Sequence, residues 1–220
     1  MAAFERLLRQ YGPQAWWPAE TPFEVMVGAV LVQQTTWANA ARAVDRIKAA
    51  GPLDCAALLQ LSEARLRALI RPAGFYRVKS TRVLHLARFV AAAGGVPGLA
   101  SWPTAALREA LLGVHGIGPE SADAIVLYAF GRPVFVVDSY ARRLFERLSS
   151  PEPGPSDRAL KARSEGELGN APALNEFHAL IVAHGKRHCG PVPDCAGCCL
   201  RELCGHGRLR ADRDARTAQL

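Results

Sequence analysis

The sequence of 220 residues lacks the features of a membrane protein, a secreted protein or a disordered chain. No uncharged apolar run reaches about 18 residues, so we expect no transmembrane helix and no membrane partner. Glu5 and Arg6 lie where a secretion signal needs an apolar core, so we expect a cytoplasmic protein. Internal repeats and low-complexity stretches are absent. Half of the residues are apolar and 21% are charged, which is the composition of a globular protein.

Lysine is scarce as well. Only four of the 27 basic side chains are Lys and the other 23 are Arg, and the formal net charge is +7. This balance favours a polyanionic partner, and the Arg guanidinium suits bidentate contacts with phosphate. A GC-rich genome would produce the same bias toward Arg. The charge is therefore compatible with nucleic-acid binding but does not establish it.

Cysteine is not distributed along the chain as it is in a disulfide scaffold. Five of the six cysteines lie within residues 189–204, and only Cys55 stands apart. Clustered thiols in a protein without a secretion signal are more typical of a metal site. Four of these five are candidate ligands: Cys189, Cys195, Cys204 and either Cys198 or the adjacent Cys199. Four thiolates this close in sequence can bind one metal ion or a cubane cluster.

Helical periodicity dominates the rest of the chain and predicts an all-α fold. Thr21 and Pro22 have the residue types of an N-cap and a first helical position. The run 134–137 could be a strand, but it has no β partner elsewhere and we expect it to lead into a helix. The expected helices span 22–34, 37–50, 62–71, 78–93, 104–112, 119–130, 139–148, 156–168 and 172–187.

A short motif joins two of these helices at residues 112–122. Gly116 and Gly118 allow a tight turn and a close approach to another molecule, and Ile117 fills the gap between the helices. The amides that begin the following helix would then face outward and could bind a phosphate. A plain helix–helix turn is the alternative, but the order of apolar, Gly and small residues favours contact with a DNA backbone.

This motif resembles the helix-hairpin-helix of the endonuclease III superfamily of DNA glycosylases. In that superfamily an Asp follows about twenty residues later, and Asp138 occupies that place. The resemblance covers residues 22–204 and implies two helical lobes with DNA in a cleft between them. It assigns a helical barrel to 22–133, with the hairpin at 112–122. Residues 1–21 and 134–205 would form an iron–sulfur domain, and 206–220 a flexible tail.

The resemblance gives Asp138 the catalytic role, because a carboxylate can stabilise positive charge on the sugar and activate water. Its alternative role is to cap the helix that begins at Ser139. Relatives that also cut the strand have a Lys two residues after the second hairpin Gly, and this chain has Glu120 there. A carboxylate cannot form a Schiff base, so we expect a monofunctional glycosylase that leaves an abasic site.

The tryptophans resemble those of the 3-methyladenine DNA glycosylase III branch, in which aromatic residues and a Pro line the base pocket. The resemblance assigns the pocket to Trp16, Trp17, Pro18 and Trp37. Indole rings favour a cationic alkylated purine by about 0.5–2 kcal/mol. Core packing is the alternative for these Trp residues. Of the two Gln that end the predicted buried helix, the resemblance assigns Gln33 to the gap left by the flipped base.

The superfamily pattern of cysteines ends in a 4Fe-4S loop, and this chain is one residue short in the first gap. Cys198 restores the superfamily spacing and Cys199 does not. The resemblance therefore implies a 4Fe-4S cluster with a structural role, and zinc is the alternative. The glycosylase III branch lacks the cluster and has a modified Lys near Lys186. The chain thus combines two patterns, and we expect Lys186 to face DNA unmodified.

We therefore expect a monomeric base-excision glycosylase acting on double-stranded DNA with a damaged base, with a preference for alkylated purines. One alternative is an endonuclease III homologue that removes oxidised pyrimidines and cuts the strand. It would need one of the four lysines in place of Glu120: Lys48, Lys79, Lys161 or Lys186. The other alternative is a catalytically weak protein that binds lesions, but such a protein has no need of Asp138.

Overall fold

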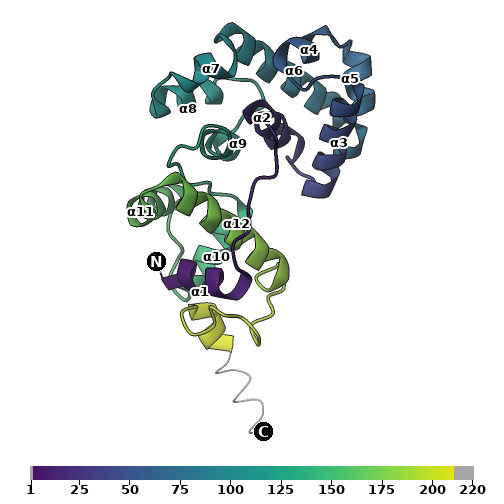
Figure 1. Cartoon of the computed structure of the whole chain (residues 1–220). Coiled ribbons are helices and arrows are strands. Elements are labelled where there is room, and N and C mark those ends of the chain that lie inside the picture. Colours follow the sequence, from purple (N-terminus) through teal and green to yellow (C-terminus); the bar gives the residue numbers. More distant parts are fainter. Residues whose placement is uncertain (1, 211–220) are drawn as a thin grey trace. The chain divides into compact units, whose positions relative to one another are not determined.

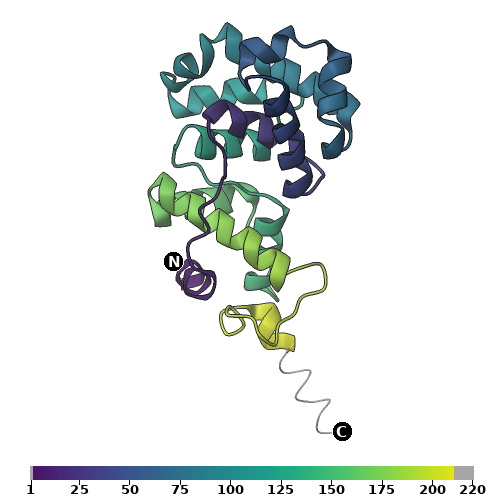
Figure 2. The same cartoon turned by 45° about the vertical axis from the view of Figure 1, so that its right-hand side comes forward.

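The computed structural model describes residues 2–210 of the chain (Figures 1 and 2). Every regular element in this range is a helix, which confirms the expected all-α fold. The chain forms two compact units. Unit 1 combines the N-terminal residues up to Trp16 with the residues from Pro133 onward, and unit 2 is Trp17–Arg132. Residues 17–21, which the sequence assigned to the iron–sulfur domain, therefore belong to unit 2.

Unit 2 is built around one buried helix, α2 (Pro22–Leu31), which packs against α3, α6, α9 and η2. Nine of its ten residues are buried, as its nearly continuous apolar sequence predicts. The other helices of the unit are α3 (Trp37–Ala50), α4 (Cys55–Gln60), α5 (Glu63–Leu69), η1 (Arg71–Ala73), α6 (Tyr76–Ala92), α7 (Gly95–Ala100), α8 (Thr104–Leu112), α9 (Pro119–Ala124) and the π-helix η2 (Ile125–Ala129).

The start of α2 agrees with the sequence and its end does not. Thr21 is the N-cap, and its side chain accepts a hydrogen bond from the Glu24 amide at 3.1 Å. The helix ends at Leu31, three residues before the predicted end at 34. Residues 32–35 form a turn instead, in which Gln34 has a left-handed backbone (φ +54°).

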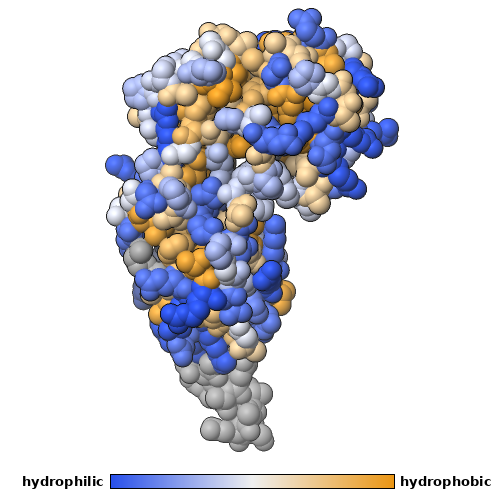
Figure 3. All heavy atoms as spheres, in the orientation of Figure 1, coloured by the Kyte–Doolittle hydropathy of each residue, from blue (hydrophilic) through white to orange (hydrophobic). Residues whose placement is uncertain are grey.

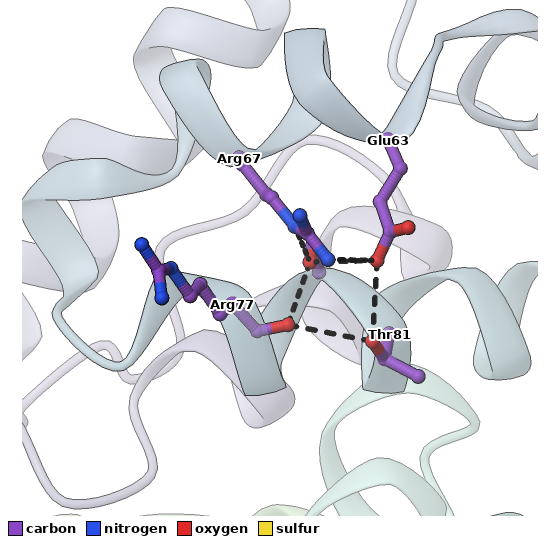
Figure 4. Close-up of polar contacts among 5 residues, drawn as sticks. Glu63, Arg67, Arg77 and Thr81 are labelled. Carbon is purple, nitrogen blue, oxygen red and sulfur yellow. Dashed lines mark hydrogen bonds and ion pairs between the residues drawn. The ribbon is translucent and has the colours of Figure 1, made fainter.

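Polar contacts fix α6 on α5 (Figure 4). Glu63 accepts hydrogen bonds from Arg67 at 2.8 Å, within α5, and from Thr81 at 3.3 Å, across to α6. Arg67 also lies 3.4 Å from the hydroxyl of Ser80, which donates to the Arg77 carbonyl. These hydrogen bonds join the first turns of α6, which also carry Lys79 and Arg82, to α5.

Unit 1 is organised by α12 (Ala171–Arg187), which packs against α1 (Ala2–Tyr11), α10 (Ser139–Ser149) and α11 (Asp157–Leu168). Phe177 of α12 is the centre of its aromatic core. Its ring lies 5.6 Å from that of Phe4, 5.7 Å from that of Phe135 and 6.2 Å from that of Phe145. Segments from both ends of the sequence thus share one core.

The segment before α10 agrees with the expectation from the sequence. Residues 131–138 form no strand, and they lead directly into α10, which begins at Ser139. Residues 205–210 are helical, and the flexibility expected of the tail from residue 206 stays a prediction. The rest of that tail, 211–220, lies outside the described residues.

The described residues contain no helix long and apolar enough to cross a bilayer. On the face of the molecule drawn in Figure 3, hydrophilic residues are interspersed with short hydrophobic areas. Four large apolar side chains are conspicuously exposed in the described chain: Phe75, Val78, Val192 and Leu209. Two of these, Phe75 and Val78, lie at the start of α6.

Candidate functional site

Asp138 is the N-cap of α10 and lies at the end of the buried segment 134–137. The Glu165 side chain fixes this segment by accepting a hydrogen bond from the Phe135 amide at 2.8 Å. The Asp138 carboxylate accepts a hydrogen bond from the Ala141 amide at 2.8 Å. Its other oxygen lies 3.5 Å from Nε2 of His178 on α12. The capping role considered from the sequence is therefore present.

The Asp138 side chain is only 12% exposed, yet its surroundings favour the charged form. Burial alone would raise its pKa. The hydrogen bond and charge of His178 and the amides of Ala141 and Tyr140 outweigh burial, so the pKa of Asp138 is lowered. A carboxylate that stays ionised at neutral pH can accept a proton or stabilise a cation. The catalytic role of Asp138 stays a prediction.

The hairpin of unit 2 joins α8 to α9 as the sequence predicts. Gly116 has φ +88°, a conformation that favours Gly, and Ile117 is buried between the helices. Gly118 is the N-cap of α9 and makes no side-chain cap. A side chain at position 118 would meet open space. The first amides of the continuous α9–η2 segment therefore have room for a phosphate oxygen.

Glu120 is an exposed residue in the first turn of α9, two positions after Gly118. No Lys follows Gly118 closely in the sequence. Each of the four lysines of the chain has other contacts: Lys48 with Glu20 and Glu24, Lys79 with two backbone carbonyls, Lys161 with Glu165, and Lys186 with the Trp16 ring.

The two Gln residues after α2 differ in their contacts. The Gln33 amide donates to the Gly116 carbonyl at 3.0 Å and to the Ser121 hydroxyl at 2.9 Å. Its oxygen accepts from Arg82 at 2.6 Å. Gln33 therefore braces the hairpin. Gln34 is exposed and its backbone is in the left-handed region (φ +54°). No sequence signal distinguished it from Gln33.

The predicted base-pocket residues divide between the units. Trp17 and Trp37 lie together in unit 2, with ring centroids 4.7 Å apart and planes at 79°. Tyr128 of η2 joins them at 5.2 Å from Trp17. Trp17 lies over Gly28 of α2, where a Cβ would come within 3.2 Å of its ring. The rings are nearly perpendicular and too close to sandwich a base, so only their outer faces can stack on one.

The other two members of the predicted pocket have different surroundings. Trp16 belongs to unit 1, where the Lys186 ammonium lies 5.7 Å from its ring centroid. Pro18 is exposed in the segment before α2. Lys186 itself is an exposed residue of α12. The cation–π contact shows that the Trp16 ring can accept a positive charge.

The four predicted cluster ligands share one cavity of unit 1. Cys189, Cys195, Cys198 and Cys204 all line it, and Cys199 does not. Burial raises the pKa of the Cys198 thiol to about 11 and also raises the pKa of Cys204. A bound cation would favour the ionised form of these thiols. Among the described residues, no group of three or more His, Cys, Asp and Glu side chains is close enough to hold a single metal ion.

Polar groups around this cavity point at the cysteine sulfurs. Arg147 donates to Cys189 Sγ at 3.2 Å and to the Gly190 carbonyl at 2.7 Å. Nε2 of the buried His184 lies 3.6 Å from Cys198 Sγ, and its Nδ1 lies 2.8 Å from the Tyr11 hydroxyl. Hydrogen bonds to ligand sulfur are typical surroundings of an iron–sulfur cluster. The four thiols and the donors around them have the chemistry that a cluster held by thiolates needs.

Sequence reasoning missed several residues of these sites. His178 lies forty residues from Asp138, and Tyr128 is more than ninety residues from Trp37. No spacing rule connects such pairs. Phe75 offered a signal, since an aromatic residue after Pro-Ala-Gly is a candidate for a tight turn. The backbone of Phe75 is in the left-handed region (φ +46°), and the residue is 63% exposed.

The sequence of this chain is similar to those of known DNA repair proteins. Residues 27–168 match the HhH-GPD superfamily of base excision DNA repair proteins. The Methanocaldococcus jannaschii protein MJ1434, which carries the name of a DNA repair glycosylase, is 40% identical over 205 residues, covering 91% of this chain and 93% of its own. Thermotoga maritima endonuclease III is 27% identical over 203 residues, covering 89% and 88%.

The fold is also similar to the solved structures of DNA repair enzymes. The H. pylori 3-methyladenine DNA glycosylase bound to 1,N6-ethenoadenine has a TM-score of 0.71 and 28% identity, covering 84% of this chain and 95% of its own. An endonuclease III–DNA complex has a TM-score of 0.79 and covers 96% of both chains. Its identity of 22% makes it similar in fold alone.

Proposed function

Because this chain belongs to the HhH-GPD superfamily and is a base excision repair DNA glycosylase, we propose that it hydrolyses the N-glycosidic bond of alkylated purines without cutting the strand. Glu120 is the observation that carries this proposal. It occupies the hairpin position at which strand-cutting relatives have the nucleophilic Lys, and a carboxylate forms no Schiff base.

Hydrolysis needs a charge near the sugar, and Asp138 supplies it. As the bond from C1′ to the base nitrogen breaks, the electron pair leaves with the base and positive charge develops on the deoxyribose. The ionised Asp138 stabilises that charge and accepts a proton from the water whose oxygen bonds to C1′. The product is an abasic site on an intact strand. His178 and the α10 amides hold the carboxylate in place.

An aromatic face favours alkylated purines as the substrate. A purine methylated at N3 or N7 is cationic, and the cluster of Trp17, Trp37 and Tyr128 offers electron-rich faces that attract a cation. The methylated base is also a good leaving group, so the reaction needs no amine nucleophile. The 28% identity to a 3-methyladenine glycosylase supports the same substrate class.

We assign the cysteine cavity to a 4Fe-4S cluster bound by Cys189, Cys195, Cys198 and Cys204. The bound cluster would fix the fold of residues 189–204 and would take no part in base release. Arg147 and His184 would donate hydrogen bonds to its thiolates. We further propose that the protein acts as a monomer on double-stranded DNA.

An endonuclease III-like lyase is the second candidate, because the cysteine pattern resembles that of endonuclease III and differs from it by one residue in the first gap. It predicts that borohydride traps a covalent protein–DNA adduct during base release. We expect no adduct with the wild type, because position 120 has no amine. The Glu120→Lys variant is the matched control, and it should give a trapped band if the hairpin lies as in the lyases. A wild-type adduct formed at the rate of base release would refute the monofunctional proposal.

Two exposed side chains are candidates for insertion into the DNA. Gln34 and Phe75 both have left-handed backbones, which cost energy for residues other than Gly and recur at functional sites. Apolar and polar side chains in such turns can fill the gap left by a flipped base. Since Gln33 already braces the hairpin, we assign the insertion to Gln34 and Phe75.

Replacing either residue by Ala tests this assignment. Phe75→Ala should weaken binding to a duplex with a tetrahydrofuran abasic site by about 5–150-fold, because stacking of an aromatic on a base contributes about 1–3 kcal/mol. Gln34→Ala should weaken it by about 2–10-fold, because a hydrogen bond contributes about 0.5–1.5 kcal/mol. Binding to undamaged duplex should not change. Val192→Ala, which removes another exposed apolar side chain, is the control. Wild-type affinity of both variants for the abasic duplex would exclude insertion by these residues.

A further inference from the structure

Lys79 is a buried ammonium that the proposed reaction does not use. It lies in the fourth position of α6 and is 1% exposed. Its Nζ donates to the Leu31 carbonyl at 2.8 Å and to the Ala73 carbonyl at 2.7 Å. Among the described residues, no carboxylate is ion-paired with it. Burial, together with the charge of Arg82, lowers the pKa of Lys79 to about 8.

The two carbonyls that Lys79 binds have the same structural position. Leu31 is the last residue of α2, and Ala73 is the last residue of η1. The carbonyls at a helix C-terminus lack intrahelical donors and carry partial negative charge. A single ammonium therefore caps two helix ends and holds them side by side.

Each of these helix ends leads directly into one of the proposed inserting residues. Gln34 follows Leu31 by three positions, and Phe75 follows Ala73 by two. One turn further along α6, Arg82 donates to Gln33 and lies against Gly116 of the hairpin. α6 is itself fixed on α5 by the contacts of Glu63 (Figure 4). Lys79 therefore connects the turns that carry Gln34 and Phe75 to α6.

We propose that Lys79 is a positioning residue that sets the spacing between Gln34 and Phe75, so that the two side chains enter the DNA as one unit. This inference rests on the proposed insertion by these two residues. It explains why the chain keeps an ammonium inside unit 2 with only neutral oxygen partners. An apolar side chain there would leave both carbonyls without a donor.

A double-mutant cycle tests the coupling in the natural Lys79 background. The probe is a duplex with a tetrahydrofuran abasic site next to 2-aminopurine, whose fluorescence reports unstacking. If the two residues insert together, Gln34→Ala and Phe75→Ala combined weaken binding by much less than the product of their separate effects. Separate effects that multiply would overturn the proposal. If neither single variant weakens binding, the insertion itself fails, which is a different outcome.

Lys79→Met tests the residue directly. It should weaken abasic-duplex binding about 10-fold or more and reduce the 2-aminopurine signal at saturating protein, while leaving binding to undamaged duplex unchanged. Lys79→Arg keeps a donor and should recover part of the signal. Val83→Ala is the control for lost stability, since it is buried in the same helix and has no polar side chain. A full 2-aminopurine signal in Lys79→Met would overturn the proposal. If Lys79→Met does not fold, the double-mutant cycle decides.

Discussion

Asp138→Asn slows base release from an alkylated duplex by about 10²–10⁴-fold, the usual contribution of a general base. Affinity for the same duplex stays within about threefold of the wild type, because the variant keeps the size of the side chain and removes only its charge and basicity. Single-turnover kinetics and binding anisotropy separate the two effects. A protein that only binds lesions would show no change in either.

The variant should remain folded, because Asn is as good an N-cap as Asp. The Ala141 amide would keep its acceptor, and α10 would keep its first turn. Ser156→Ala is a suitable control, since it removes the N-cap of α11 from the same unit without changing Asp138. Wild-type kinetics in Asp138→Asn would contradict the assignment, whatever the control shows.

The lowered pKa of Asp138 also predicts a pH dependence. The folded pKa lies below the unfolded value of about 3.9, so the carboxylate stabilises the fold above that pH. This contribution is lost as the pH falls through the folded pKa. Asp138→Asn should therefore reduce the stability difference between neutral pH and pH 3. Base release by the wild type should show no acid limb from this residue above pH 4.

The second large effect is expected at the cysteine cavity. Cys198→Ser should lose the iron and the visible absorbance of the cluster, because it removes one of the four thiols that line the cavity. Cluster binding contributes to folding free energy, so the unfolding temperature should fall by about 10 °C or more. Iron analysis and thermal unfolding monitored by circular dichroism measure both effects.

Cys199→Ser is the matched control, since it makes the same chemical change in the adjacent residue. Cys199 does not line the cavity, so this variant should hold about four irons per chain, as expected for a cubane cluster. Equal loss of iron in both variants would mean that the ligand set is assigned incorrectly. If the wild-type protein contains zinc and no iron, the site binds zinc and the assignment of a 4Fe-4S cluster is wrong.

Much of the fold could be predicted from local sequence signals. The bounds of α3 and α8 agree with the prediction, because Thr36 caps the first and Gly113 follows the second. The short helices α4 and α7, of six residues each, were missed because they are too short for a hydrophobic period to stand out. The predicted helix 119–130 is an α-helix that becomes a π-helix at Ile125, a change that no periodicity predicts.

The residues proposed to be functional differ in how far the sequence indicates them. The proposed cysteine ligands, the hairpin and Asp138 are separated by characteristic spacings and could be proposed from sequence. His178, Tyr128 and Lys79 make contacts between elements that are distant in the chain, so only the fold reveals them. The sequence does not show which of the adjacent residues Gln33 and Gln34 contacts the hairpin. In the fold it is Gln33, whose amide donates to Gly116 and Ser121.

Base release from a panel of duplexes tests the central claim most directly. The duplexes would carry 3-methyladenine, 7-methylguanine or thymine glycol, and strand breaks would be counted before and after alkali. We predict that the enzyme releases the alkylated purines faster than thymine glycol and that breaks appear only after alkali. Faster release of thymine glycol with breaks before alkali would contradict the account.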